Sequence, residues 1–144
     1  MKILMLYGPS HSGKTTTINM VYDALIAQNA IPKKPRPFPK AVNIQDYKGK
    51  DFEAVLECNA KGGTIKVALF SMGDIAYEVV HAMSFYEGMG CDVLVCACND
   101  RFNVPTKRLQ NRYKNVYPPI IKTVNRLGQI NVNQQDVTRI IQMI

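Results

Sequence analysis

The feature that most constrains the fold of this chain is the octapeptide GPSHSGKT at residues 8–15, which has the spacing G-x-x-x-x-G-K-[ST]. An apolar run from Lys2 to Tyr7 precedes it and is typical of a buried parallel strand. From Lys14 to about Gln28, apolar residues recur at helical spacing. The chain is therefore expected to pass from a strand through a tight loop into a helix, which favours an α/β fold.

The residue types of this loop suit the binding of a polyphosphate. Gly8 and Gly13 permit backbone angles and a close approach that larger residues prevent, so that successive N–H groups can surround an anion at the start of a helix. We expect Lys14 to bridge the β- and γ-phosphates and the Thr15 hydroxyl to bind Mg²⁺. The predicted nucleotide-binding residues are Gly8, Pro9, Ser10, His11, Ser12, Gly13, Lys14, Thr15 and Thr16, of which His11 is expected to face solvent.

Through this loop and the order of strands and helices over most of the chain, the sequence resembles the P-loop NTPase superfamily, and its pattern is nearest to small nucleotide-kinase-like members. The resemblance implies a site for Mg²⁺ and a nucleoside triphosphate, with ATP as the expected nucleotide, but it does not define the reaction. Most members of the superfamily have an Asp directly after a central hydrophobic strand. Here Ser71 follows the run Val67–Phe70 at that position.

Two carboxylates are candidates for the role of the missing aspartate. Asp74 comes three residues after Ser71, and we interpret it either as a displaced metal ligand or catalytic base, or as a residue that caps the next helix. Asp100 follows the buried run Val93–Cys98 and is expected at the same sheet edge as the loop, because parallel strands direct their C-terminal ends to one crevice. The alternative for Asp100 is a turn formed with Asn99.

Arginines follow the same strand. Arg101 is predicted to lie near the crevice, and the resemblance to nucleotide kinases implies that it could stabilise a transferring phosphoryl group. Arg108 and Arg112 are four residues apart on a helix predicted over Thr106–Asn115 and could reach the same anion. A solvated basic surface is an equally good interpretation of any one of these residues.

The remainder of the chain alternates strand and helix patterns. The runs Phe52–Cys58 and Thr64–Phe70 predict an antiparallel hairpin, and a helix is expected after Gly73. Ile120–Val124 is expected to be the last strand, with a closing helix marked by apolar residues from Val137 onward. We therefore predict a single three-layer α/β domain over residues 1–144, in which helices cover both faces of a mainly parallel sheet with one hairpin. Residues 30–51, rich in proline and in basic residues, are expected to form a mobile loop.

Charge and composition point to an anionic partner. The net charge of +7 comes from 18 basic and 11 acidic residues, and residues 101–126 contain seven basic residues and no acidic one. A second basic cluster consists of Lys33, Lys34, Arg36 and Lys40. The partner could be the phosphates of a nucleotide or a nucleic-acid backbone. The four cysteines lack the spacing of a zinc site and are expected in the core. No apolar run approaches the roughly 20 residues of a membrane span, so we expect a cytoplasmic protein without a membrane partner.

Three functions agree with these observations. The first is a nucleotide-kinase-like phosphotransferase that uses ATP, Mg²⁺ and an unknown phosphoryl acceptor, with Lys14, Asp74, Asp100 and Arg101 as catalytic candidates and Thr15 and Asp74 as metal ligands. The second is a nucleic-acid-associated or assembly-forming ATPase that uses the basic segments. The third is a GTPase-like switch, which ranks lower because the D-x-x-G match at residues 46–49 precedes the hairpin instead of following it.

Overall fold

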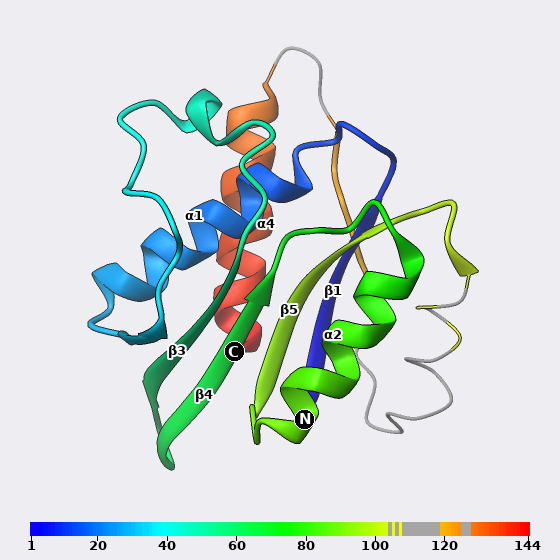
Figure 1. The fold of residues 1–144 in the computed structure, drawn as a ribbon. Coiled ribbons are helices and arrows are strands. Elements are labelled where there is room, and N and C mark those ends of the chain that lie inside the picture. The colour runs from blue at the N-terminus through cyan, green and yellow to red at the C-terminus, as the bar shows by residue number, and fades with distance from the viewer. Residues whose placement is uncertain (104, 106, 108–118, 125–127) are drawn as a thin grey trace.

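The structure is a computed structural model that describes residues 1–103, 105, 107, 119–124 and 128–144. Its described part is an α/β domain in which a mixed, mostly parallel sheet packs against helices (Figure 1). The elements, in chain order, are β1 (Lys2–Gly8), α1 (Lys14–Ala27), β2 (Ile31–Lys34), the 3₁₀-helix η1 (Ile44–Tyr47), β3 (Glu53–Ala60), β4 (Gly63–Phe70), α2 (Ala76–Gly88), β5 (Val93–Asn99), β6 (Ile120–Ile121) and α4 (Gln129–Met143).

The strand order across the sheet is β2-β3-β4-β5-β1-β6. Strand β5 is parallel to both β1 and β4, and β1 is also parallel to β6. The predicted hairpin is confirmed, since β3 and β4 pair antiparallel with Glu53 opposite Phe70. The C-terminal ends of β1, β4 and β5 consequently share one edge of the sheet with the N-terminal end of β3, the upper edge in Figure 1.

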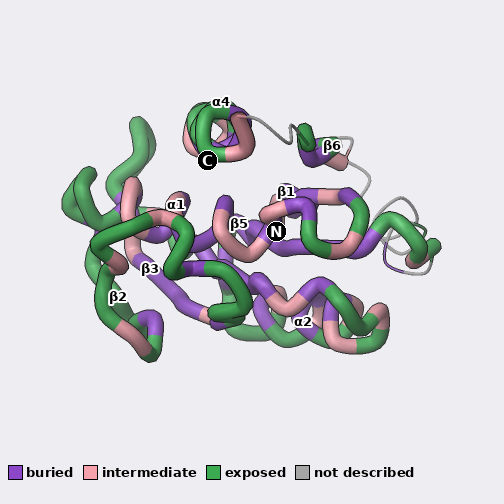
Figure 2. Tube along the Cα trace, turned by 90° about the horizontal axis from the view of Figure 1, so that it is seen from above, coloured by how far each residue is buried: buried purple, intermediate pink, exposed green. Residues whose placement is uncertain are grey.

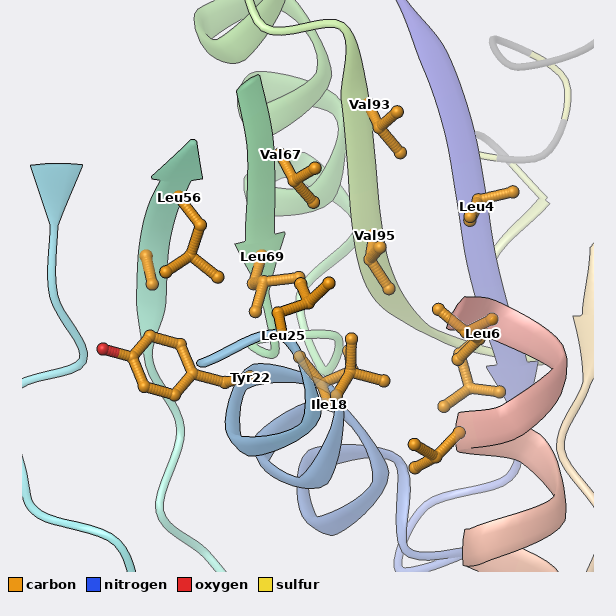
Figure 3. Packing of buried hydrophobic residues seen from close by; sticks show 14 of the residues in the cluster. Leu4, Leu6, Ile18, Tyr22, Leu25, Leu56, Val67, Leu69, Val93 and Val95 are labelled. Atoms are coloured by element: carbon orange, nitrogen blue, oxygen red, sulfur yellow. The ribbon is translucent and has the colours of Figure 1, made fainter. Parts of the chain in front are cut away.

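Two hydrophobic clusters stabilise the sheet, one on each face. Because side chains alternate along a strand, Leu4 and Leu6 belong to one cluster while Ile3 and Met5 belong to the other. The first cluster joins the strands to α1 and α4, as Figure 3 shows for Ile18 and other α1 residues, and the second joins them to α2. Figure 2 shows α2 and α4 on opposite sides of β1 and β5. All four cysteines are buried with free thiols, as the sequence predicted.

Three predicted boundaries are wrong. The proline-rich segment is not a loop throughout, because Ile31–Lys34 forms the edge strand β2, where Pro32 is tolerated in an irregular pairing with β3. The last strand is only Ile120–Ile121, shorter than expected. The closing helix begins at Gln129, well before the apolar residues that marked it. Its first turns carry mostly polar side chains, so the apolar spacing did not reveal them.

One predicted helix lies outside the described residues. The helix predicted over residues 106–115, with Arg108 and Arg112, falls almost entirely on residues that the structure does not describe. Among the described helices, none has the length and apolar character needed to cross a membrane.

Candidate functional site

The loop of residues 8–15 connects the end of β1 to the start of α1, as predicted. Gly13 has a φ of +87° and directly precedes α1, a left-handed conformation that favours glycine. Gly8 is required for a different reason, since a Cβ there would lie 2.8 Å from the Cβ of Lys122. No side chain among the described residues caps α1, and its first turn contains no acidic residue. The loop therefore presents backbone N–H groups and the positive end of the α1 dipole to a group bound at the N-terminus of the helix.

Lys14 lies inside this loop. Its Nζ donates hydrogen bonds to the carbonyl oxygens of Gly8 at 3.0 Å and Pro9 at 2.7 Å, and the residue is only 6% exposed. Burial lowers the pKa of Lys14 below its usual value, while the negative charges of Asp74 and Asp100 oppose this shift. The partly desolvated ammonium has neutral carbonyls as its hydrogen-bond partners. An anion beside it would stabilise its positive charge further.

A cavity of about 340 Å³ opens beside the loop. Four parts of the chain line it: the loop and first turn of α1, the segment around η1, the residues after β4, and the start of α4 (His11, Ser12, Gly13, Lys14, Thr15, Thr16, Ile44, Gln45, Lys48, Gly49, Asp51, Ser71, Gly73, Asp74, Gln129, Ile130 and Asn133). His11 is exposed, as expected. Among these residues the sequence predicted site roles for the loop and Asp74, and it placed Ser71 where an aspartate usually follows the central strand.

Asp51 is the carboxylate that contacts the loop threonine. The Thr15 hydroxyl donates to Asp51 Oδ1 at 2.7 Å, and the Ser71 hydroxyl lies 3.3 Å from the same oxygen. The Phe52 N–H in turn donates to Ser71 Oγ at 2.8 Å. Sequence reasoning missed Asp51, although the predicted hairpin contained the signal: a residue just before β3 must lie beside the residue just after β4.

Asp74 also lines the cavity, and its carboxylate is exposed. The alternative role of helix capping is wrong, because Ile75 is the N-cap residue of α2 and no side-chain cap bond forms there. Asp74 exerts the strongest of the opposing charge effects on the pKa of Lys14. Gly73 allows Asp74 to lie at the cavity, because without a side chain its backbone can pack directly against β5. Its carbonyl accepts a hydrogen bond from the Asn99 N–H at 3.0 Å.

Asp100 and Arg101 lie near the loop but are not among the residues that line the cavity. The Asp100 N–H donates to the Gly8 carbonyl at 3.1 Å, which agrees with the prediction that Asp100 emerges at this sheet edge. Arg101 Nη2 donates to Ser10 Oγ at 3.0 Å, and the amide of Asn99 donates to the same oxygen at 2.6 Å. Asn99 is thus a buried anchor of the loop that the sequence did not indicate.

The basic cluster of the proline-rich segment is largely neutralised within the chain. Lys33 pairs with Glu57 at 2.9 Å, Lys34 pairs with Glu53, and Arg36 pairs with Asp23 at 3.0 Å. These pairs lower the positive field that this segment offers to a nucleic-acid backbone, in contrast to the expectation from sequence. A basic run in a sequence does not reveal which carboxylates lie opposite it in an adjacent strand or helix.

The donors at the cavity fit a triphosphate with Mg²⁺. The Ser12 hydroxyl is buried without a hydrogen-bond partner in the described structure, so the loop holds an unused polar group. The described residues contain no group of three or more His, Cys, Asp or Glu side chains that could hold a metal ion. Mg²⁺ commonly takes one or two protein ligands and completes its shell with phosphate oxygens and water, and Thr15 with Asp51 or Asp74 would suit that mode.

Comparisons of the chain with protein-family models, with curated proteins and with solved structures find no significant match, so a function must be argued from the site itself.

Proposed function

We propose that this chain is a three-layer P-loop protein that binds a nucleoside triphosphate with Mg²⁺, ATP being the expected nucleotide, and catalyses phosphoryl transfer or hydrolysis. The observation that carries the proposal is the position of Lys14, whose ammonium is buried in the Gly8–Thr15 loop against two carbonyls, beside a cavity that also exposes Thr15 and two carboxylates. A buried cation, free helix N–H groups and paired oxygen ligands on one cavity are the elements of a polyphosphate site.

The residues of the cavity have separate roles in this proposal. Lys14 and the loop N–H groups bind the β- and γ-phosphates, whose negative charge replaces the Gly8 and Pro9 carbonyls as partner of the ammonium. Thr15 and a carboxylate, Asp51 or Asp74, hold Mg²⁺, which when bound neutralises phosphate charge. Asp51 is supported by its hydrogen bond with Thr15, and Asp74 by its electrostatic effect on Lys14.

Nucleotide-kinase-like transfer is the reaction that we favour. The cavity extends from the loop to η1 and to the start of α4, so it has room for an acceptor beside the phosphates. Gln45 lies on its η1 wall, and on its α4 wall the Gln129 amide bonds the Ser12 carbonyl and Asn133 Oδ1. Arg101 lies on the Ser10 side of the loop, within reach of phosphate oxygens carried there. The internal pairing of Lys33, Lys34 and Arg36 argues against the nucleic-acid-dependent alternative for that cluster.

Binding of a triphosphate with and without Mg²⁺, measured by titration calorimetry, tests the proposal. Lys14→Ala should weaken binding by about 100-fold, since two charge-assisted hydrogen bonds are lost at roughly 1.5 kcal/mol each. Circular dichroism should show an unchanged fold. Lys61→Ala, in the exposed β3–β4 turn, is the matched control and should bind as the wild-type protein does. Equal affinity of the Lys14 and Lys61 variants would refute the site.

Product analysis then distinguishes the two reactions. Incubation with γ-labelled ATP and a panel of nucleoside monophosphates should give label on one monophosphate if the protein is a nucleotide kinase. Release of inorganic phosphate at the same rate with or without every acceptor would instead identify hydrolysis.

A further inference from the structure

Arg36, expected in a mobile basic loop, is one of the most enclosed charged residues in the described chain. Its side chain is 2% exposed. Four aromatic rings surround the guanidinium carbon, with centroids 4.7 Å away for Tyr22, 4.9 Å for Tyr47, 5.1 Å for Phe38 and 6.0 Å for Phe52. Such contacts favour a planar cation over the ring faces. We call this set of side chains the Arg36 cluster.

Hydrogen bonds tie the Arg36 cluster to α1. Arg36 Nη2 donates to Asp23 Oδ1 at 3.0 Å, and Nη1 donates to Asn19 Oδ1 at 3.1 Å. The Tyr47 hydroxyl donates to the second oxygen of Asp23 and accepts a bond from the Ala41 N–H at 2.9 Å. Burial and the bond to Asp23 both raise the pKa of the Tyr47 hydroxyl, so it remains a donor. The segment from Arg36 to Tyr47, η1 included, is thereby held against one helix.

Asn19 connects this cluster to the candidate site. Its side chain is fully buried, and while Oδ1 accepts from Arg36, the Nδ2 group donates to the carbonyls of Thr15 at 3.0 Å and Lys50 at 3.1 Å. Asp51, the next residue after Lys50, accepts the hydrogen bond of the Thr15 hydroxyl. Asp51 lies before β3, just beyond the bond from the Ser71 N–H to the Phe52 carbonyl that continues the β3–β4 pairing. Its carboxylate contacts Thr15 and Ser71, and Asn19 holds the carbonyl of Lys50, the residue before it.

We propose that Arg36 and Asn19 are positioning residues, which hold the segment from η1 to Asp51 so that the Asp51 carboxylate meets Thr15 at the metal side of the cavity. The proposal rests on the proposed function and deepens it. A buried ion pair is weak evidence for stability, since apolar residues often replace one without loss, but it can specify a single conformation. Here the conformation that it specifies is that of a cavity wall without regular sheet pairing.

Two variants test the two connections of the network. Arg36→Met fills much of the same space among the rings but removes every donor. Asn19→Asp retains an oxygen acceptor for Arg36 and removes the amide donor to the Thr15 and Lys50 carbonyls, so it breaks the connection between the cluster and the segment before Asp51. Lys34→Met is the matched control, because it removes a cation of the same segment whose side chain is 46% exposed.

The first measurement is tryptic cleavage after Lys48 and Lys50 without nucleotide. We expect about tenfold faster cleavage in Arg36→Met and Asn19→Asp than in the wild-type protein, because local opening of the released segment should become easier. The Lys34 variant should be cleaved at the wild-type rate. Unchanged cleavage in both folded variants would overturn the anchoring.

The second measurement is triphosphate affinity with and without Mg²⁺. In the two variants the gain in affinity from Mg²⁺ should fall about tenfold. Metal-free affinity should stay within about twofold of wild type in Arg36→Met, which leaves the contacts of the loop and Lys14 intact, whereas Asn19→Asp also removes a bond to the Thr15 carbonyl. A parallel loss of both affinities in Arg36→Met would indicate a purely structural role and overturn the proposal, as would an unchanged gain in both variants. If the wild-type protein itself bound no triphosphate, the proposed function would fail, whereas wild-type binding with unaffected variants would refute only the positioning role.

Discussion

Replacement of Gly73 by alanine should disturb both the sheet and the candidate site. A Cβ built on Gly73 would lie 2.7 Å from the carbonyl carbon and from the Cβ of Ala97, and 2.9 Å from its carbonyl oxygen. Ala97 belongs to the interior strand β5 and pairs with Leu6 of β1, one residue beyond the end of the β4–β5 pairing, so its backbone has little room to move. The segment after β4 would have to shift away from β5, and with it the adjacent Asp74.

This close approach means that the added methyl group of Gly73→Ala overpacks the interior beside β5. Overpacking of a well-packed interior typically lowers the free energy of unfolding by about 1–3 kcal/mol. For a chain of this size each kcal/mol lowers Tm by roughly 2–4 °C, so Gly73→Ala should melt about 2–12 °C below the wild-type protein. A displacement of about 1 Å at a reacting group can cost on the order of 100-fold in rate, so turnover should fall by more than the stability loss alone would explain.

Urea unfolding with a matched glycine provides the assay. Gly88 ends α2, and a Cβ there would meet nothing within 4 Å. Gly88→Ala should therefore be neutral or stabilising by about 0.5–1 kcal/mol, because alanine loses less backbone entropy in a helix. If Gly73→Ala proved as stable as Gly88→Ala with the same urea dependence, the close approach to β5 would be refuted.

Three further outcomes concern charged groups. Asp136→Asn should lower the free energy of unfolding by about 3–5 kcal/mol, because it leaves the buried Lys122 ammonium, 2.7 Å away, without its counter-charge; in urea unfolding the exposed-pair variant Lys33→Met should cost under about 1 kcal/mol, and equal losses would contradict this. Burial alone would raise the pKa of Glu53, but hydrogen bonds from a lysine and a tyrosine hold it below 4.5. The stability from Glu53 is therefore present above pH 4.5 and lost as the pH falls through the lowered pKa, so Glu53→Gln should flatten the acid side of a stability–pH curve, and an unchanged curve would refute the assignment. Because burial lowers the pKa of Lys14 below 10.5, triphosphate affinity should decline as the pH rises toward that value, and a similar decline in Lys14→Ala would assign it to another group.

The local elements were predictable because their signals are local. The glycine and lysine spacing of residues 8–15, the helical period of α1 and the apolar runs of β1 and β5 each lie within one short window. The same windows failed at β2, where proline masked an edge strand, and at the start of α4, where polar side chains masked a helix. In both places packing against neighbouring elements outweighed the local preference.

The candidate site was predictable only in part. Asp74 was identified from its place after a strand, and the structure brings it to the cavity. Asp51 could have been predicted only by extending the hairpin register past its last pair, Glu53 with Phe70, to the residues just before β3 and just after β4. The enclosure of Arg36 had no signal in the sequence, since a lysine- and arginine-rich stretch is typical of an exposed segment.

By itself, the sequence determined that a strand turns through a glycine loop into a helix and that Lys14 lies in that loop, because steric limits and periodicity act between near neighbours. Only the tertiary structure decided that Asp51 meets Thr15 across 36 residues of chain and that Arg36 is buried among aromatic rings. Those contacts depend on the order of the strands and on the path of the segment between β2 and β3. That path is set by burial and hydrogen bonding over the whole domain.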